Sequence, residues 1–214
     1  MRHARVRAPR RDEPSVSGQV SSSGTAGLIL AAGESRRMGR PKALLRYREE
    51  TFLDTLAGLF AGVCSPVIVV LGAAADEIRV GARRPATFVH NQNYMRGQTS
   101  SMQCGLRAVP PQAAGVLFTL VDHPAVTAAT LGRLLNGAGS ARVRVPRYQG
   151  RKGHPIWFSR DLIAEFLSLP EDGAARDVVR AHAAETEFVD VDDAGVVADI
   201  DNPEEYSRLM GVAV

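Results

Sequence analysis

Short apolar segments rich in β-branched residues alternate with segments of helical spacing through the first two-thirds of this 214-residue chain. The early apolar segments are hydrophobic along their whole length rather than at every second position, which is typical of strands covered on both faces. The alternation therefore predicts an α/β fold of the three-layer, Rossmann-like kind, with helices on both sides of a mostly parallel sheet. We expect strands at 27–31, 67–71, 87–89, 116–121, 142–145, 156–158, 187–191 and 196–200.

Helices are predicted where apolar residues recur at intervals of three and four. Residues 52–63 are the clearest case, because six large apolar side chains there follow the i, i+3, i+4, i+7 rule. Residues 142–158 differ, since two strand-like runs flank the turn-like residues 149–153, and we expect a β-hairpin inserted in or beside the sheet. Further helices are expected at 74–80, 100–108, 127–135, 160–167, 174–183 and 203–210.

The basic charge of the chain is confined to its start. The formal net charge is +3, and residues 1–13 carry five arginines against Asp12 and Glu13, so the rest of the chain is neutral. This distribution argues against a nucleic-acid partner, which would need a basic face on the folded body. Residues 1–24 hold few large apolar side chains, so we expect a disordered basic tail there and a single folded domain over 25–214.

Neither a membrane segment nor a disulfide framework is expected. No apolar run approaches the roughly 18 to 20 residues that cross a bilayer. Cys64 and Cys104 lack CxxC spacing and are expected to be reduced thiols. We therefore expect a cytoplasmic protein without a membrane partner.

Residues 28–42, LILAAGESRRMGRPK, join an apolar strand to a glycine-centred turn that carries cationic side chains. The first turn after a strand commonly faces phosphate in sheets of this kind. Gly33 lets backbone amides approach an anion, and Ser35 adds a hydroxyl donor. The charge that would neutralise a triphosphate comes from Arg36, Arg37 and Lys42. Among 26 basic residues only Lys42 and Lys152 are lysines.

The spacing of this loop excludes three common nucleotide-binding motifs. A Walker A loop needs GxxxxGK, whereas here five residues separate Gly33 from Gly39 and Pro41 precedes the lysine. The dinucleotide fingerprint GxGxxG is absent, and so are the HRD and DFG elements of protein kinases.

The loop resembles the signature LAAGxSxRMGxPK of the MobA-like nucleotidyltransferases that activate the molybdenum cofactor. Arg36 falls on a variable position of that signature. The matching residues are Leu30, Ala31, Ala32, Gly33, Ser35, Arg37, Met38, Gly39, Pro41 and Lys42.

The resemblance continues to about residue 209. Asp122 and Pro124 stand where the family has Asp-x-Pro, residues 153–155 match its GHP, and residues 199–203 match its DIDxP, with Asn202 where threonine is usual. The family segment NxxYxxGxxxSMxxGL is matched by Asn91, Tyr94, Gly97, Ser101, Met102, Gly105 and Leu106, with Ser100 beside them.

The resemblance implies a division of roles among these residues. Catalytic roles fall to Arg37, Lys42 and Asp122, and the acceptor would lie near His154 and Lys152. The nucleotide-binding residues it implies are Leu30, Ala31, Ala32, Gly33, Ser35, Arg36, Arg37, Lys42, Ser100, Ser101 and Gly105.

Three carboxylates are candidate ligands for a Mg²⁺ cofactor. Magnesium needs only one or two protein carboxylates besides substrate phosphates. Asp122 follows an apolar strand, which places it at the ligand-binding edge, although it could instead cap the next helix. If a strand ends near residue 200, Asp199 and Asp201 share a face. We expect Asp201 to bind metal, with Asp199 second, although residues 202–205 also form a helix cap.

The function that this resemblance implies is Mg²⁺-dependent transfer of a nucleoside monophosphate from an NTP to molybdopterin cofactor, with release of pyrophosphate. The AAGxS turn and the GHP element favour CTP as donor. A molybdoenzyme or its chaperone is a further expected partner. Three alternatives stay open: guanylyl transfer to the same cofactor, a nucleotidyltransferase for a sugar phosphate or isoprenoid precursor, and a non-catalytic cofactor-binding chaperone of the same fold.

Overall fold

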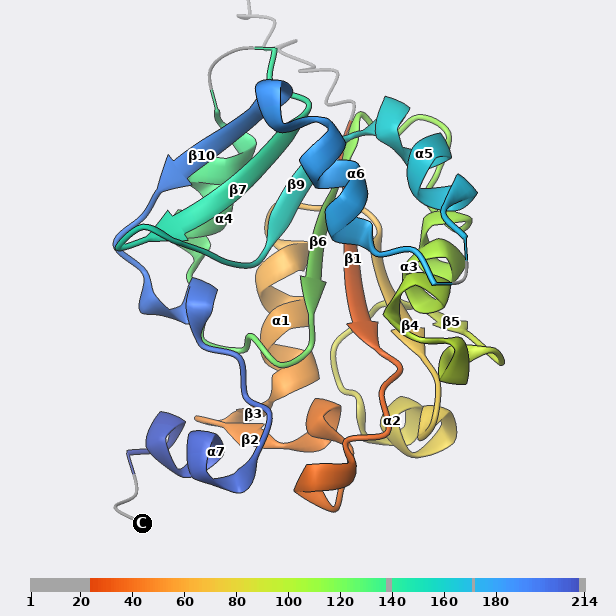
Figure 1. Cartoon of the computed structure of the whole chain (residues 1–214). Helices are drawn as coiled ribbons and strands as arrows, with labels where there is room; N and C mark the ends of the chain where they lie inside the picture. The colour runs from red at the N-terminus through yellow and green to blue at the C-terminus, as the bar shows by residue number, and fades with distance from the viewer. Residues whose placement is uncertain (1–23, 138–139, 171, 212–214) are drawn as a thin grey trace, which may run out of the picture.

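The central element is a twisted sheet whose main path runs β10-β7-β9-β6-β1-β4-β5, with the short strand β8 paired to β7 (Figure 1). The structure, a computed structural model, describes residues 24–137, 140–170 and 172–211. Strands β5, β4, β1 and β6 are parallel to one another, β10 is parallel to β7, and β9 runs antiparallel to both β6 and β7. The strands are β1 Thr25–Ala31, β4 Val67–Leu71, β5 Thr87–His90, β6 Gly115–Leu120, β7 Val143–Tyr148, β8 Arg151–Lys152, β9 Ile156–Ser159 and β10 Thr186–Asp190.

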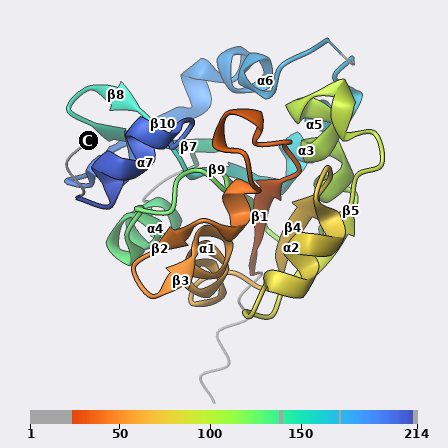
Figure 2. The same ribbon diagram turned by 90° about the horizontal axis from the view of Figure 1, so that it is seen from below.

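Helices cover both faces of this sheet, which confirms the predicted α/β class and its three layers (Figure 2). Helices α1, α2 and α4 pack on one face, and α3, α5 and α6 pack on the other. The helices are α1 Phe52–Ala61, α2 Ala75–Gly81, α3 Gln98–Leu106, α4 Ala128–Leu135, α5 Ile163–Ser168, α6 Ala175–Ala181 and α7 Pro203–Leu209. Short 3-10 helices are η1 Arg36–Met38, η2 Lys42–Leu44, η3 Tyr94–Arg96, η4 Arg160–Leu162, η5 Ala183–Glu185 and η6 Ala194–Val197, and a small two-stranded sheet pairs β2 Arg46–Tyr47 with β3 Glu50–Thr51.

Strand β1 explains the continuous hydrophobicity seen in the sequence. Ile29 and Ala31 belong to the apolar cluster under α1, α2 and α4, whereas Leu28 and Leu30 belong to the cluster under α3, α5 and α6. Because neighbouring side chains point to opposite faces, a strand covered on both sides must be apolar at every position. Full burial of such a side chain contributes roughly 1.5–3 kcal/mol to folding.

The predicted hairpin is confirmed. Strand β7 turns at Gln149 and Gly150, both at positive φ, and returns as β8, after which β9 pairs with β7 and joins it to β6. Gly153 follows β8 and lies so close to η6 that a Cβ atom there would be 1.9 Å from the carbonyl oxygen of Val196. The hairpin and η6 can approach this closely only because residue 153 has no side chain.

The predicted strand at 196–200 is wrong. This segment begins within η6, and its backbone makes isolated cross-links rather than a ladder: Val196 O accepts from His154 N at 2.8 Å, and Ile200 N donates to Asp122 O at 3.0 Å. The buried carboxylate of Asp193 starts η6 by accepting from Gly195 N at 2.9 Å. Val196 and Ile200 are buried in this irregular segment, which explains why its sequence is a short apolar run like that of a strand.

The remaining helices and strands lie within a few residues of their predicted positions. The predicted tail at 1–24 lies outside the described residues apart from Gly24. Within the part of the chain that the structure describes, no helix has both the length and the apolar composition to cross a bilayer.

Gly105 offers a test of the packing between α3 and the sheet. A Cβ atom there would lie 2.4 Å from Leu28 Cδ1 and 2.6 Å from Val70 Cγ2. Overpacking of a core costs about 1–3 kcal/mol, which exceeds the roughly 1 kcal/mol that alanine gains over glycine inside a helix. We expect Gly105→Ala to lower the free energy of unfolding, measured by urea denaturation.

Gly132 is the matched control, because it lies inside α4 and a Cβ atom there meets nothing within 4 Å. We expect Gly132→Ala to raise the free energy of unfolding by about 0.5–1 kcal/mol. Stabilisation of the protein by both substitutions would contradict the tight packing of α3 on β1 and β4.

Candidate active site

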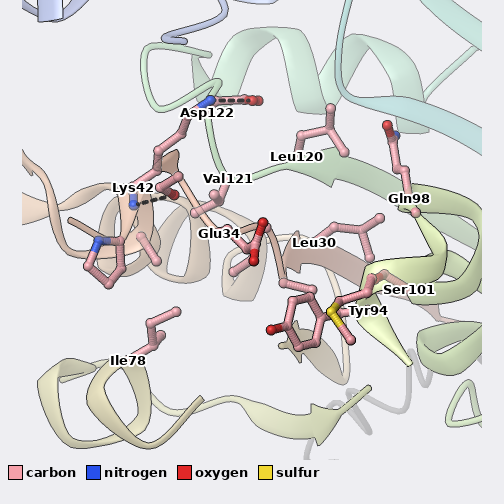
Figure 3. Close-up of a pocket in the computed structure, with 18 residues that line it drawn as sticks. Leu30, Glu34, Lys42, Ile78, Tyr94, Gln98, Ser101, Leu120, Val121 and Asp122 are labelled. Carbon is pink, nitrogen blue, oxygen red and sulfur yellow. Dashed lines mark hydrogen bonds and ion pairs between the residues drawn. The ribbon is translucent and has the colours of Figure 1, made fainter. Parts of the chain in front are cut away.

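A cavity of about 350 Å³ opens at the carboxyl edge of the parallel strands (Figure 3). It lies between the loop after β1, the end of β6 and the start of α3. Lys42 and Asp122 lie at one end of this cavity, and Gln98 and Ser101 lie at the other (Figure 3). We call it the loop cavity.

The loop after β1 is held in shape by its own side chains. Ser35 adopts the left-handed region with φ of 53°, and Gly39 does so with φ of 67°. Ser35 Oγ accepts a hydrogen bond of 3.0 Å from the backbone nitrogen of Lys42, which closes the loop. The hydroxyl proton of Ser35 is therefore still available as a donor. Leu30, Ala31, Ala32 and Gly33 line the cavity together with Ser35.

Lys42 lies at the centre of the polar end of the cavity. Its ammonium is 2.5 Å from Asp201 Oδ1 and 3.3 Å from Asp122 Oδ2. Its side chain is 14% exposed, Asp122 is 16% exposed and Asp201 is 35% exposed, so these charges meet in a partly desolvated place. The fold thus brings together three predicted site residues that are far apart in the chain. Asp122 follows Lys42 by 80 positions, and Asp201 follows it by 159.

Asp201 is held from two sides. Its second oxygen, Oδ2, accepts from Arg37 Nη2 at 2.8 Å, and its backbone nitrogen donates to Glu205 Oε2 at 2.6 Å. Asn202 caps α7 by accepting from Glu205 N at 2.9 Å. The hydrogen bond from Lys42, with the charges of Lys42 and Arg37, lowers the pKa of Asp201, so this carboxylate is ionised at neutral pH. The helix cap and the charged contact therefore coexist in one segment.

Asp122 is suited to a divalent cation. It follows β6, and its Oδ1 atom is buried without a hydrogen-bond partner among the described residues. The closest ring nitrogen, His123 Nδ1, is 4.0 Å away and is hydrogen bonded to Ala198 O at 3.3 Å. A buried carboxylate oxygen without a donor has an open coordination position, and Mg²⁺ or Mn²⁺ prefers oxygen ligands of this kind.

Asp199 lies apart from this cluster. It is exposed, and the strand alternation that would have placed it on one face with Asp201 does not exist. Within the described residues, no group of three or more His, Cys, Asp or Glu side chains is arranged to hold a metal. A metal here would therefore need ligands from a bound substrate.

Four predicted nucleotide-binding residues are not among those that line the loop cavity. The Arg37 side chain is 67% exposed and pairs with Asp201. The Arg36 side chain is 82% exposed and pairs with Glu34 at 2.6 Å. Ser100 Oγ lies within hydrogen-bond distance of the carbonyl oxygens of Asn93 and Gly97, and the Asn91 amide donates to both Ser100 and Ser101. Gly105 packs against the sheet. Of the helix α3 residues predicted from the resemblance, Ser101 alone lines this cavity.

A second cavity of about 520 Å³ adjoins the first and contains both residues predicted to bind the acceptor, Lys152 and His154. Gln98, at the start of α3, borders both cavities. The side chains of the second cavity are mostly apolar, with Phe118 and Phe188 among them, and Lys152 Nζ lies 4.6 Å from the Phe188 ring centre. Arg176 and Arg180 add cationic charge at its border.

His154 is a neutral group in this second cavity. Burial, together with the neighbouring His123, lowers the pKa of His154 to about 3 against a smaller opposite effect of the Phe118 backbone. The two imidazole rings stack with centroids 4.9 Å apart, and the Phe118 ring meets His154 edge-on at 5.7 Å. The Nδ1 atom of His154 is buried without a hydrogen-bond partner in the described part of the chain.

Several cavity residues had no strong sequence signal. Ile78 reaches the loop cavity from α2, and Met95 and Gln98 lie on the segment that leads into α3. Arg176 and Arg180 lie on α6, where they read as an ordinary solvated helix face. Gln98 could have been found, because it follows Gly97 at the start of a helix that the sequence placed near the nucleotide.

The family model of the MobA-like NTP transferase domain matches residues 27–186. Nicotine blue oxidoreductase of Paenarthrobacter nicotinovorans is 32% identical over 86% of this chain and 95% of its own length. Molybdenum cofactor cytidylyltransferase of Escherichia coli K12 is 27% identical over 84% of this chain and 92% of its own length. A probable molybdenum cofactor guanylyltransferase of Opitutus terrae is 32% identical over 60% of this chain and 63% of its own length.

Solved structures agree with this match. Rv0371c of Mycobacterium tuberculosis superposes with a TM-score of 0.78 at 30% identity, over 88% of this chain and 98% of that protein. Its complex with manganese superposes with a TM-score of 0.72 at 28% identity, over 89% of this chain and all of that chain. The matched domain contains the loop after β1, Asp122 and His154. The chain therefore belongs to the MobA-like NTP transferase family and is a nucleotidyltransferase.

Proposed function

We propose that this protein transfers CMP from CTP to the terminal phosphate of molybdopterin cofactor and releases pyrophosphate, with Mg²⁺ or Mn²⁺ as cofactor. The observation that carries the proposal is the meeting of Lys42, Asp122 and Asp201 at the polar end of a cavity formed by the loop after β1. A polyphosphate binds to cations and amide donors, whereas a divalent ion binds to carboxylate oxygens. Both kinds of group lie at this end of the cavity.

The reaction requires positioned charge rather than acid–base chemistry. An oxygen of the acceptor phosphate forms a bond to the α-phosphorus, the bond from that phosphorus to the β-phosphate oxygen breaks, and pyrophosphate leaves. Both the attacking and the departing groups are already anionic, so no proton must move. Lys42 and Arg37 would hold the departing phosphates, and Asp122 and Asp201 would hold a metal ion that stabilises the charge on the reacting phosphate.

The second cavity supports a large acceptor that is part heterocycle and part phosphate. Phe118 and Phe188 offer apolar contact area to a flat ring system, and Lys152 offers charge to a phosphate. The neutral imidazole of His154 can donate or accept one hydrogen bond to a heteroatom of that ring. Gln98 borders both cavities, which puts the expected point of attack near the start of α3.

The choice of CTP has support from two sources. The turn reads Ala31-Ala32-Gly33, and the hairpin carries the GHP element at 153–155, a combination that favours the cytidylyl branch. The cytidylyltransferase of Escherichia coli aligns with 84% of this chain, whereas the guanylyltransferase of Opitutus terrae aligns with 60%. Transfer of the product to a molybdoenzyme or its chaperone, in the cytoplasm, is part of this proposal.

The metal proposal predicts a sharp difference among the carboxylates. We expect Asp122→Asn and Asp201→Asn each to lower kcat by about 10²–10³, because each loses the negative charge that holds the metal. Asp199→Asn is the matched control, and its kcat should stay within about twofold of wild type because that side chain lies outside the cluster. Turnover of CTP with molybdopterin cofactor and Mg²⁺ gives these rates.

Circular dichroism spectra of the three variants show whether the fold is kept. A folded Asp122→Asn protein with wild-type kcat would rule out Asp122 as a metal ligand. A loss of activity in Asp199→Asn alone, with Asp201→Asn unaffected, would exchange the roles of these two residues.

The nucleotide and the acceptor can be assigned in one measurement. We expect pyrophosphate release to be fastest with CTP, at least about tenfold above GTP in kcat/KM, which corresponds to about 1.4 kcal/mol of discrimination. We expect release to depend on added molybdopterin cofactor. Faster release with GTP would indicate guanylyl transfer, and release with a sugar phosphate or isoprenoid precursor would indicate a different acceptor. Binding of CTP and the cofactor without any release would indicate a non-catalytic chaperone.

A further inference from the structure

We infer that Lys42 acts as an exchangeable internal cation: in the nucleotide-free protein its ammonium occupies the position between Asp122 and Asp201 that a divalent ion needs, and triphosphate binding draws it away. The inference rests on the proposed function, since it requires a polyphosphate and a divalent ion to meet in the loop cavity. It adds an order of binding: the metal should bind tightly only after Lys42 has formed an ion pair with the triphosphate.

The hydrogen bonds of the cluster show how little of it is free for a metal. Asp201 uses both carboxylate oxygens, Oδ1 for Lys42 at 2.5 Å and Oδ2 for Arg37 at 2.8 Å. Asp122 uses Oδ2 for Lys42 at 3.3 Å and keeps only Oδ1 without a partner. A metal ion entering this structure would therefore obtain one free carboxylate oxygen, and any second one must be taken from Lys42 or Arg37.

The charges of the cluster balance as they stand. Lys42 and Arg37 contribute two positive charges, and Asp122 and Asp201 contribute two negative charges. A divalent ion added alone would enter beside these two cations. The Lys42 side chain is only 14% exposed, and poor solvation strengthens its repulsion of the ion, whereas the Arg37 side chain is 67% exposed and is better screened. A triphosphate added with the ion supplies the anionic charge that Lys42 and Arg37 would otherwise lose.

The geometry lets Lys42 change partners without moving the main chain. Its backbone nitrogen is fixed by Ser35 Oγ at 3.0 Å, and it follows Pro41 at the start of η2. Its flexible four-carbon stem lies along the wall of the loop cavity, so rotation about side-chain bonds can move the ammonium from the carboxylates toward the loop amides. The exchange needs no rearrangement of the loop.

Metal binding to the nucleotide-free protein tests this inference. We expect Lys42→Met, which keeps the stem and removes the charge, to tighten Mn²⁺ binding about tenfold in the absence of nucleotide, measured by isothermal titration calorimetry. Lys152→Met is the matched control, because it makes the same change at the only other lysine, in the second cavity, and Mn²⁺ affinity should stay at the wild-type value. Unchanged or weaker Mn²⁺ binding by a folded Lys42→Met protein would overturn the inference.

A second measurement uses the wild-type chain and does not depend on the stability of a variant. Because the chain contains two lysines, labelling with ¹³Cε-lysine gives two side-chain signals by NMR, and Lys42→Met assigns them, or Lys152→Met if the former does not fold. We expect saturation with Mg²⁺ and a CTP analogue with a methylene between its α- and β-phosphorus to shift the Lys42 signal. A Lys42 signal that stays in place under saturation would overturn the inference.

The outcomes separate this inference from the proposed function. Binding of Mn²⁺ that Asp122→Asn abolishes, but that Lys42→Met does not tighten, would keep the carboxylate metal site and reject the exchange. Absence of Mn²⁺ binding in every variant, with and without the CTP analogue, would reject both.

Discussion

The contact of one ammonium with two carboxylates is the interaction around which this site is built. Lys42, Asp122 and Asp201 come from the loop after β1, the end of β6 and the start of α7. Each of the three chain segments is fixed by its own local bonds: Ser35 to Lys42, Asp122 O to Ile200 N, and Glu205 to Asp201. The charged side chains therefore meet on a prepared frame, and little conformational entropy remains to be lost when a ligand enters.

The parallel sheet explains why these segments converge. Parallel strands β1 and β6 end at the same edge, and η6 returns the C-terminal segment to that edge through its contact with the hairpin at Gly153. The antiparallel strand β9 lies on the other side of β6, and its residues Ile156 and Phe158 line the second cavity. One fold thus provides a cavity with a charged end beside a larger, mostly apolar cavity.

The proposed exchange of Lys42 gives the charge balance of the cluster a functional meaning. A site that already contains its own cation is stable without ligands, and it releases that cation only to an anion that pairs with it better. Differential interaction of the two ligands with the two positions of Lys42 is the source of the coupling between metal and nucleotide.

The sequence by itself determined the α/β class, the hairpin, the helix caps, the loop after β1 and the identity of its lysine, because each of these depends on local spacing or on a short motif. It ranked Asp201 before Asp199 but wrongly expected them to share the face of a strand. The segment instead contains η6, whose shape depends on Asp193 and on the packing of Gly153 against Val196. The sequence could not separate Ser101 from Ser100 or place Arg176 near His154, because helix rotation and packing against the sheet set those directions. Tertiary structure alone decided which charges meet, since contacts across 80 and 159 positions arise from the whole core rather than from neighbours in the chain.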